Sequence, residues 1–105
     1  MVIAMFIMEP GQRDDEFQRL NALIYAAAEA TGGFLGEEMW RAVDGTRMNA
    51  IYYWESMGAL EEFAKHPNHL EAKRQYERWY DGYQVVVAEV QNAYGDGALV
   101  HLTKT

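Results

Sequence analysis

The chain has 105 residues, half of them apolar, and a formal net charge of −7. This length is typical of one folded domain, and an acidic chain without a basic cluster is a poor partner for nucleic acid or for an anionic membrane surface. There is no cysteine, which excludes disulfides, thiolate metal sites and cysteine nucleophiles. The longest apolar run, Met1 to Met8, is too short to cross a bilayer and lacks the features of a signal peptide, so we expect a cytoplasmic protein.

The first third of the chain predicts a strand followed by a helix. Residues Val2 to Met8 form a short apolar run that stops at Glu9-Pro10-Gly11, and their lack of alternation indicates a strand buried on both faces. Asp14 and Asp15 then suit the N-cap and first turn of an amphipathic helix, which Thr31-Gly32-Gly33 should end.

A hairpin is expected next, because Asp44-Gly45 lies between two aromatic-rich runs, Phe34 to Val43 and Arg47 to Trp54. A turn at those two residues pairs Val43 with Thr46. It also predicts three further pairs: Trp40 with Asn49, Met39 with Ala50, and Glu37 with Tyr52. By alternation, one face carries Trp54, Tyr52 and Ala50 together with Leu35, Glu37 and Met39.

Two helical segments and a final strand are expected after the hairpin. Ser56 suits the N-cap of a short helix, and Pro67 interrupts the helical pattern. Asn68 can cap a second segment, which Gly82 should end. Tyr83 to Val90 is rich in β-branched residues and predicts a strand. We expect one domain over residues 1–95 and, over residues 96–105, a C-terminal arm that is available to a partner subunit.

The predicted element order is β-α-β-β-α-β, the ferredoxin-like arrangement of an α+β fold with a four-stranded antiparallel sheet. Two helices cover only one face of such a sheet. However, the first and last strands are apolar on both sides, and the hairpin is aromatic on both sides. Because an apolar second face needs a cover, we expect a homodimer in which two sheets pack face to face.

The chain is also rich in aromatic residues, with three Trp, seven Tyr and four Phe. These residues suit a well-filled core. They also suit a pocket that binds a small apolar or aromatic molecule, since such pockets are lined mainly by aromatic and apolar side chains, although composition alone favours the core.

A set of short motifs runs through the second half of the chain: Tyr53-Trp54-Glu55-Ser56, Ala59-Leu60, Phe63, His66-Pro67-Asn68-His69, Ala72-Lys73 and Trp79-Tyr80-Asp81-Gly82-Tyr83. Together they resemble the antibiotic biosynthesis monooxygenase family. The resemblance implies a dimeric α+β barrel with a pocket between each sheet and its helices. It also implies one of several activities, which include cofactor-independent oxidation of phenols to quinones and heme degradation.

Heme degradation is disfavoured at the residue level. The relatives with this activity have an Asn on the first strand, a Trp and a His ligand, and the matching positions here hold Ala4 or Met5, Phe63 and Lys73. A protonated Lys cannot ligate iron. His66 or His69 could still ligate a heme by another route, since neutral imidazole is a good ligand. Two His alone are too few protein ligands for a metal site, so we expect none.

The resemblance to the quinone-forming members is partial. Trp54 matches their Trp, but Asn49 lies one position out of phase with their Asn, and it points to the other face unless a bulge intervenes. The candidate catalytic residues are Trp54, Tyr52, Asn49 and His69, and the candidate substrate-binding residues are His66, Glu37, Met39 and Phe63. A structural alternative stands beside them: a Trp that ends a strand is commonly a core residue, and His66 and His69 equally suit a helix junction.

Two functional hypotheses follow. The first is a cofactor-independent monooxygenase that acts on a small aromatic or quinol-like substrate between the sheet and the helices. The second is a non-catalytic dimer of the same fold that binds a small ligand or heme.

Overall fold

A computed structural model describes residues 1–103 of the chain. These residues form four strands and three helices, in an order that confirms the α+β prediction: β1 Val2–Pro10, α1 Asp15–Ala30, β2 Phe34–Arg41, β3 Met48–Trp54, α2 Met57–Ala64, α3 Pro67–Trp79 and β4 Tyr80–Glu89. No helix within the described part of the chain is long and apolar enough to cross a bilayer.

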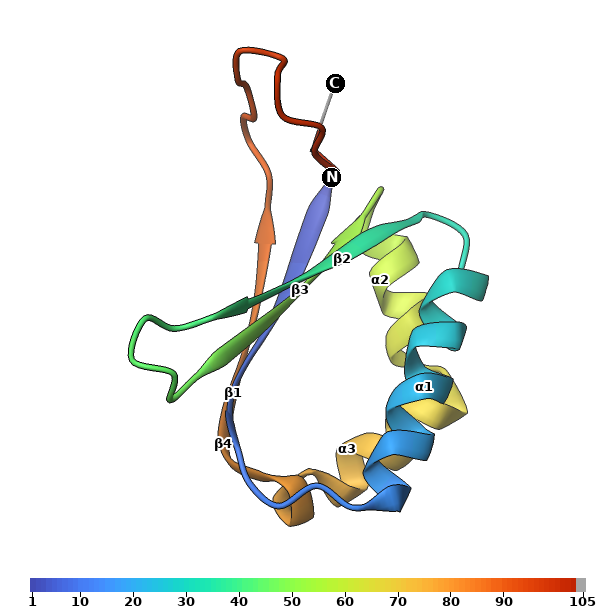
Figure 1. Cartoon of the computed structure of the whole chain (residues 1–105). Helices are drawn as coiled ribbons and strands as arrows, with labels where there is room; N and C mark the ends of the chain where they lie inside the picture. The colour runs from blue at the N-terminus through green and yellow to red at the C-terminus, as the bar shows by residue number, and fades with distance from the viewer. Residues whose placement is uncertain (104–105) are drawn as a thin grey trace.

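The four strands make one antiparallel sheet in the order β2-β3-β1-β4, which is the ferredoxin-like topology. Figure 1 shows the sheet as one twisted layer with all three helices on the same side. Side chains directly opposite one another in paired strands share a face. The register therefore defines two rows on the helix side, Glu89–Val2–Trp54–Phe34 and Val87–Ala4–Tyr52–Glu37.

Asp14 caps α1 as predicted, and it also ties this helix to the end of α3. Its carboxylate accepts a hydrogen bond from the backbone nitrogen of Phe17 at 2.9 Å and from Trp79 Nε1 at 3.0 Å. Arg78 donates to the same carboxylate at 2.7 Å. The bond from Phe17 is the main cause that lowers the pKa of Asp14. One residue thus closes the first turn of α1 and positions α3 beside it.

The predicted hairpin register is confirmed, because Trp40 lies opposite Asn49, Met39 opposite Ala50 and Glu37 opposite Tyr52. The turn itself differs from the two-residue form. The backbone nitrogen of Ala42 donates to Arg47, and that of Gly45 donates to Ala42, so the loop takes four residues, 43–46. The register survives because both loops keep the same pairs of residues opposite one another.

The predicted place of Leu35 is wrong, because β2 is irregular between Phe34 and Gly36. Phe34, and not Leu35, lies opposite Trp54, and the two ring centroids are 5.0 Å apart. Gly36 has a φ of +145°, in the region that favours glycine. An extra residue in one strand shifts the alternation by one, so counting by twos across Leu35 assigns the wrong face.

The junction between α2 and α3 also differs from the prediction. Ser56 caps α2 as expected. However, His66 caps α3, not Asn68: its Nδ1 accepts a hydrogen bond from the backbone nitrogen of Asn68 at 3.1 Å, and Pro67 occupies the first turn. His66 is in the extended conformation that a residue before proline prefers, which is also the conformation of an N-cap.

The end of α3 was predicted too late in the chain. The helix stops at Trp79 and β4 starts at Tyr80, so Gly82 lies within a strand and ends no helix. The backbone nitrogen of Gly11 donates to the Trp79 carbonyl at 2.8 Å, which anchors this abrupt change from helix to strand.

The C-terminal arm folds back onto the outer face of the sheet of its own chain. His101 Nε2 lies 3.0 Å from Glu38 Oε1, which also accepts a hydrogen bond from the Tyr53 hydroxyl at 2.6 Å. Burial and this bond raise the pKa of Tyr53 to about 12. The Leu102 side chain packs against Gly36. Residues 104 and 105 of the predicted arm lie outside the described residues.

Candidate functional site

An aromatic cluster lies between the sheet and the helices, around the residues predicted to be functional. Trp54 is fully buried, and it packs against Phe63 of α2 with ring centroids 5.1 Å apart. Phe63 also stacks on Tyr52 at 6.0 Å and meets the edge of the His69 ring at 4.9 Å. Four of the predicted site residues, from β3, α2 and α3, are therefore brought together, with Phe63 at the centre.

Two polar atoms of this cluster have no hydrogen-bond partner within residues 1–103. They are Trp54 Nε1, which can only donate, and His69 Nδ1, and both are shielded from solvent. Burial lowers the pKa of His69, and the Lys73 ammonium lowers it further. The His69 imidazole is therefore neutral near pH 7, the form in which one ring nitrogen accepts a hydrogen bond or a proton.

Tyr52 supplies a hydroxyl on the same side of the sheet. Glu37 lies directly opposite it on β2, as predicted. Burial, together with the negative charge and hydrogen bonding of Glu37, raises the pKa of Tyr52 well above its usual range. The Tyr52 hydroxyl therefore stays protonated and acts as a hydrogen-bond donor.

A second aromatic group lies farther along the same face, and the sequence reasoning missed it as part of the site. The Phe6 ring lies 5.2 Å from Tyr76, 5.2 Å from Tyr80 and 5.4 Å from Tyr83, measured between centroids. Burial and the neighbouring tyrosines raise the pKa of Tyr76 to about 12. Spacing by two along β1 places Phe6 on the helix side, but nothing in the sequence pairs it with residues that lie seventy or more positions away.

Three predicted residues lie apart from the aromatic cluster. Asn49 is on the outer face of the sheet, opposite Ile7 and Trp40, as its odd offset from Trp54 implies. Met39 lies on the helix side, where its side chain is exposed near the hairpin. His66 uses its Nδ1 to cap α3. In the described part of the chain, no three His, Cys, Asp or Glu side chains are arranged to hold a metal ion.

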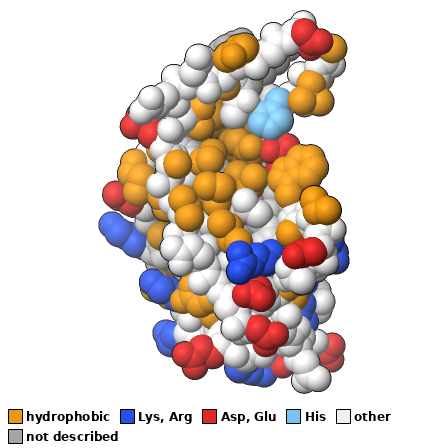
Figure 2. Space-filling model, turned by 90° about the vertical axis from the view of Figure 1, so that its left-hand side faces the viewer, with side chains coloured by type: hydrophobic (Ala, Val, Ile, Leu, Met, Phe, Trp, Pro, Cys, Tyr) orange, Lys and Arg blue, Asp and Glu red, His pale blue; other side chains and the backbone are white. Residues whose placement is uncertain are grey.

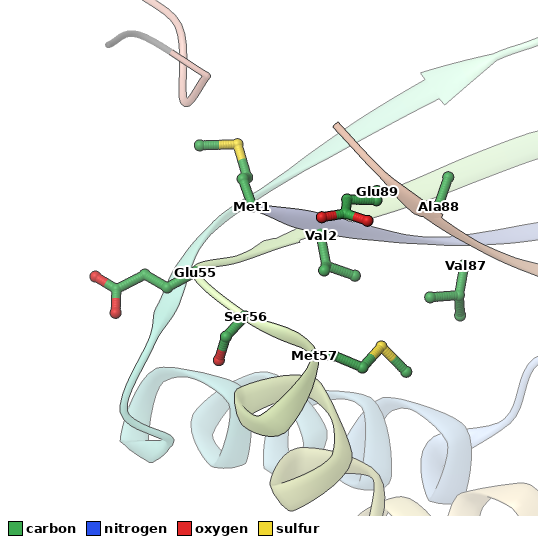
Figure 3. A pocket seen from close by; sticks show the side chains of 8 residues that line it. All are labelled: Met1, Val2, Glu55, Ser56, Met57, Val87, Ala88 and Glu89. Atoms are coloured by element: carbon green, nitrogen blue, oxygen red, sulfur yellow. The ribbon is translucent and has the colours of Figure 1, made fainter. Parts of the chain in front are cut away.

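An open hollow of about 380 Å³ lies beside the aromatic cluster, where the end of β4 and the start of β1 pass over the start of α2. Figure 3 shows the side chains of Val2, Met57 and Val87 converging on it. Glu89 lies near Val2, whereas the Glu55 side chain points away. A second hollow of about 290 Å³, near the other end of β4, is lined by Ile7, Met8, Glu9, Arg47, Gly82, Tyr83 and Gln84.

Solved structures with the same fold come from several organisms. The chain superposes on SnoaB of Streptomyces nogalater, a cofactor-independent oxygenase, with a TM-score of 0.70 and 15% identity, over 88% of this chain and 94% of SnoaB. It superposes on Rv0793 of Mycobacterium tuberculosis with a TM-score of 0.67 and 21% identity, over 90% and 98%. A candidate antibiotic biosynthesis monooxygenase of Nitrosomonas europaea gives 0.69 and 9%, over 88% and 100%. At these identities the likeness shows the fold alone.

Sequence comparison adds a relative and a family. YqjZ of Bacillus subtilis, an uncharacterised protein, is 42% identical over 59 residues, which are 55% of this chain and 51% of YqjZ. The match thus spans about half the length of this curated relative. The family model for af470-like monooxygenases matches residues 9–93. The chain therefore belongs to the af470-like monooxygenases, within the antibiotic biosynthesis monooxygenase fold.

Proposed function

We propose that the protein is a cofactor-independent monooxygenase, and that it oxidises a small aromatic or quinol-like substrate held between the sheet and the helices. One observation carries the proposal: Trp54 Nε1 and His69 Nδ1 are buried without partners within residues 1–103, on either side of Phe63. A buried polar group without a partner costs roughly 1–3 kcal/mol, so such atoms commonly mark a place where a ligand provides the partner.

The proposed chemistry uses one proton acceptor, His69, and one hydrogen-bond donor, Trp54. The substrate has a reactive CH₂ group between aromatic rings, and His69 accepts a proton from it. The resulting carbanion reduces dioxygen, and the overall reaction is R₂CH₂ + O₂ → R₂C=O + H₂O. Trp54 Nε1 donates to the substrate oxygen that carries the negative charge, because a fixed donor in a water-poor site stabilises such an anion. No metal or organic cofactor takes part.

The family and one structural relative support this proposal. The family is one of monooxygenases, and SnoaB, which shares the fold, is a cofactor-independent oxygenase. The shielding of the aromatic cluster from solvent also supports it, since a reactive carbanion must be kept away from water.

The test measures oxygen uptake with a panel of anthrones and quinols. We expect turnover by the purified protein, and we expect Trp54→Phe to lower kcat/KM about 100-fold, since one donor to the anion is lost. Trp79→Phe is the matched control, because Trp79 is equally buried but donates to Asp14. Trp79→Phe should lower the free energy of unfolding and leave kcat/KM unchanged.

Two outcomes would contradict the proposal. One is no oxygen uptake across the panel. The other is an equal loss of activity in Trp54→Phe and Trp79→Phe, since this would identify a general effect on folding. A Soret band on titration with hemin, removed by His69→Ala, would identify the heme-binding alternative.

We propose in addition that two copies pair through the outer faces of their sheets. Apolar side chains gather on this face, as Figure 2 shows, with charged side chains mainly around them. The register places on it Ile3, Met5, Ile7, Ile51, Val86 and Ala88. An apolar sheet face of this kind commonly packs against another sheet, and a second copy provides an identical one.

A further inference from the structure

The C-terminal arm is held at both of its ends. The backbone nitrogen of Val90 donates to the Met1 carbonyl at 3.0 Å, which fixes the start of the arm beside β1. Near the other end, His101 Nε2 lies 3.0 Å from Glu38 Oε1 on β2. Figure 1 shows the arm looping beyond the sheet and returning to the start of β1. The residues between, 91–100, therefore form a loop with two anchors and not a free tail.

The second anchor is a network of hydrogen bonds on the outer face of the sheet. Glu38 Oε1 accepts from the Tyr53 hydroxyl at 2.6 Å. His101 Nδ1 accepts from the backbone nitrogen of Thr103 at 3.1 Å, so the ring proton is on Nε2, which donates to Glu38. The His101 ring also meets the Tyr53 ring edge to face, with centroids 5.6 Å apart. The arm is thus fixed to the sheet by directional contacts, which determine where the loop points.

The loop presents apolar side chains to solvent. The exposed ones are Tyr94, Leu99 and Val100, at 92%, 76% and 86%. Asp96 is the single charged residue in 91–100, and its carboxylate already accepts a hydrogen bond from the backbone nitrogen of Ala98 at 2.9 Å. Segments that stay solvated are usually rich in charge, whereas exposed apolar groups that lie together commonly mark a contact with another protein.

The arm lies on the face through which two copies are proposed to pair. Glu38 lies opposite Ile51, and Tyr53 lies opposite Ile3, so a body that covers Ile3 and Ile51 also meets the arm. The apolar side chains of that face are themselves half-buried, whereas a stable interface takes about 800 Å² from each partner. The loop supplies nearly fully exposed apolar surface beside them. A second copy of this chain is therefore the occupant that the loop fits.

We propose that residues 91–100 form a clasp that contacts a second copy of this chain through Leu99 and Val100. The bonds among Glu38, Tyr53 and His101 hold the clasp in position. This inference rests on the proposed pairing through the outer faces, and it does not depend on the oxygenase proposal. In a two-fold symmetric dimer both clasps act at once, so each substitution removes two contacts.

The first test measures the dissociation constant of the dimer by analytical ultracentrifugation over a dilution series. Replacing both Leu99 and Val100 by Ser should raise this constant at least about tenfold, because apolar surface buried in the dimer is lost. Val43→Ser is the matched control, since it removes an equally exposed apolar side chain from the hairpin loop, and it should have no effect. An unchanged constant in the double variant would overturn the clasp. A lower constant would do so too, since it would identify the arm as an obstacle to pairing.

The second test follows the anchor and the protection of the loop. His101→Ala should also raise the dissociation constant, and adding it to the double Ser variant should have little further effect, because both changes remove the same contact. Chymotrypsin should cut after Tyr94 more slowly once the protein concentration exceeds the dissociation constant. A cutting rate that is independent of concentration, or fully additive effects of the substitutions, would contradict the clasp.

Failure of the clasp can be told apart from failure of the pairing. If the wild-type protein is a dimer that Met5→Lys dissociates, but that the double Ser variant leaves intact, the pairing stands and the clasp is overturned. Met5 lies between Ile51 and Val86 on the outer face, away from the arm. A wild-type protein that is monomeric throughout the dilution series would overturn both proposals.

Discussion

Trp54 and Trp79 are both fully buried indoles, and they differ in one hydrogen bond. Trp79 Nε1 donates to Asp14 at 3.0 Å, whereas Trp54 Nε1 has no partner within residues 1–103. Because nearly all buried donors in proteins are paired, this difference separates a purely structural tryptophan from one with an unused donor. Burial alone does not distinguish them, so the expectation that a strand-end Trp belongs to the core holds for Trp54 without excluding a second role.

The low pKa of His69 leads to a prediction about pH. Burial holds this pKa below the ordinary value of 6.5, so the folded protein binds the proton less tightly than the unfolded chain does. Stability from the neutral ring is complete above pH 6.5 and is lost as the pH falls from 6.5 towards the folded-state pKa. We expect the free energy of unfolding, measured with urea, to fall between pH 7 and pH 5. In His69→Gln this fall should be smaller.

The pH dependence of kcat/KM should follow the titration of His69. We expect kcat/KM to be constant from pH 8 to pH 6.5, and to fall about tenfold per pH unit once His69 is protonated, because the cationic ring cannot accept a proton. Carboxylates with lowered pKa values, such as Asp14 and Glu38, act only at lower pH. If kcat/KM falls with pH in the same way in His69→Gln, a group other than His69 causes the fall.

At the scale of single elements, the irregularity in β2 decides which aromatic ring lies on Trp54. Gly36 takes a positive φ that a side chain rarely adopts, and Leu102 of the C-terminal arm fills the space beside it. The irregularity turns Phe34 towards the helices, and it leaves space on the outer face in which Leu102 of the arm packs against Gly36. A sequence pattern of period two cannot reveal the irregularity, since the contact partner lies more than sixty residues away.

Gly36→Ala tests this anchor. A Cβ there would lie 2.8 Å from Leu102 Cδ2, so both strain and a clash are expected, with a loss of about 2–3 kcal/mol in the free energy of unfolding. Gly45→Ala has a positive φ of +78° but open space, so it should lose only about 1–2 kcal/mol. Urea unfolding measures both. Leu102→Ala should recover part of the loss in the Gly36 variant, and additive effects of the two substitutions would contradict the contact.

At the scale of the whole molecule, the sheet has one face covered by helices and one apolar face that only the C-terminal arm partly covers. The arm reaches Glu38 and Tyr53 on the β2 side of this face, where Glu38 lies directly opposite Ile51, and it stays away from Val86 on β4. Since large apolar patches on a lone domain are rare, the proposed sheet-to-sheet dimer accounts for the amino-acid composition of this face.

The dimer leads to a prediction about mass. Light scattering at micromolar concentration should give twice the chain mass of 12.1 kDa. Met5→Lys places a charge in the middle of the outer face, between Ile51 and Val86, where it would be buried without a partner, so this variant should be monomeric. Val43→Lys, on the exposed loop, should remain dimeric. A monomeric wild-type protein, or a dimeric Met5→Lys variant, would refute this mode of pairing.

The amino-acid sequence by itself determined the order of the elements, the caps Asp14 and Ser56, and the hairpin register with Glu37 opposite Tyr52. These features depend on interactions between residues close in the chain, which leave a local pattern. Only the tertiary structure decided that Phe34 replaces Leu35 on Trp54, that the Trp54 and His69 nitrogens are buried without partners, and that Met57 and Val87 face one hollow. Those features depend on how distant segments pack, and packing leaves no periodic trace in any one of them.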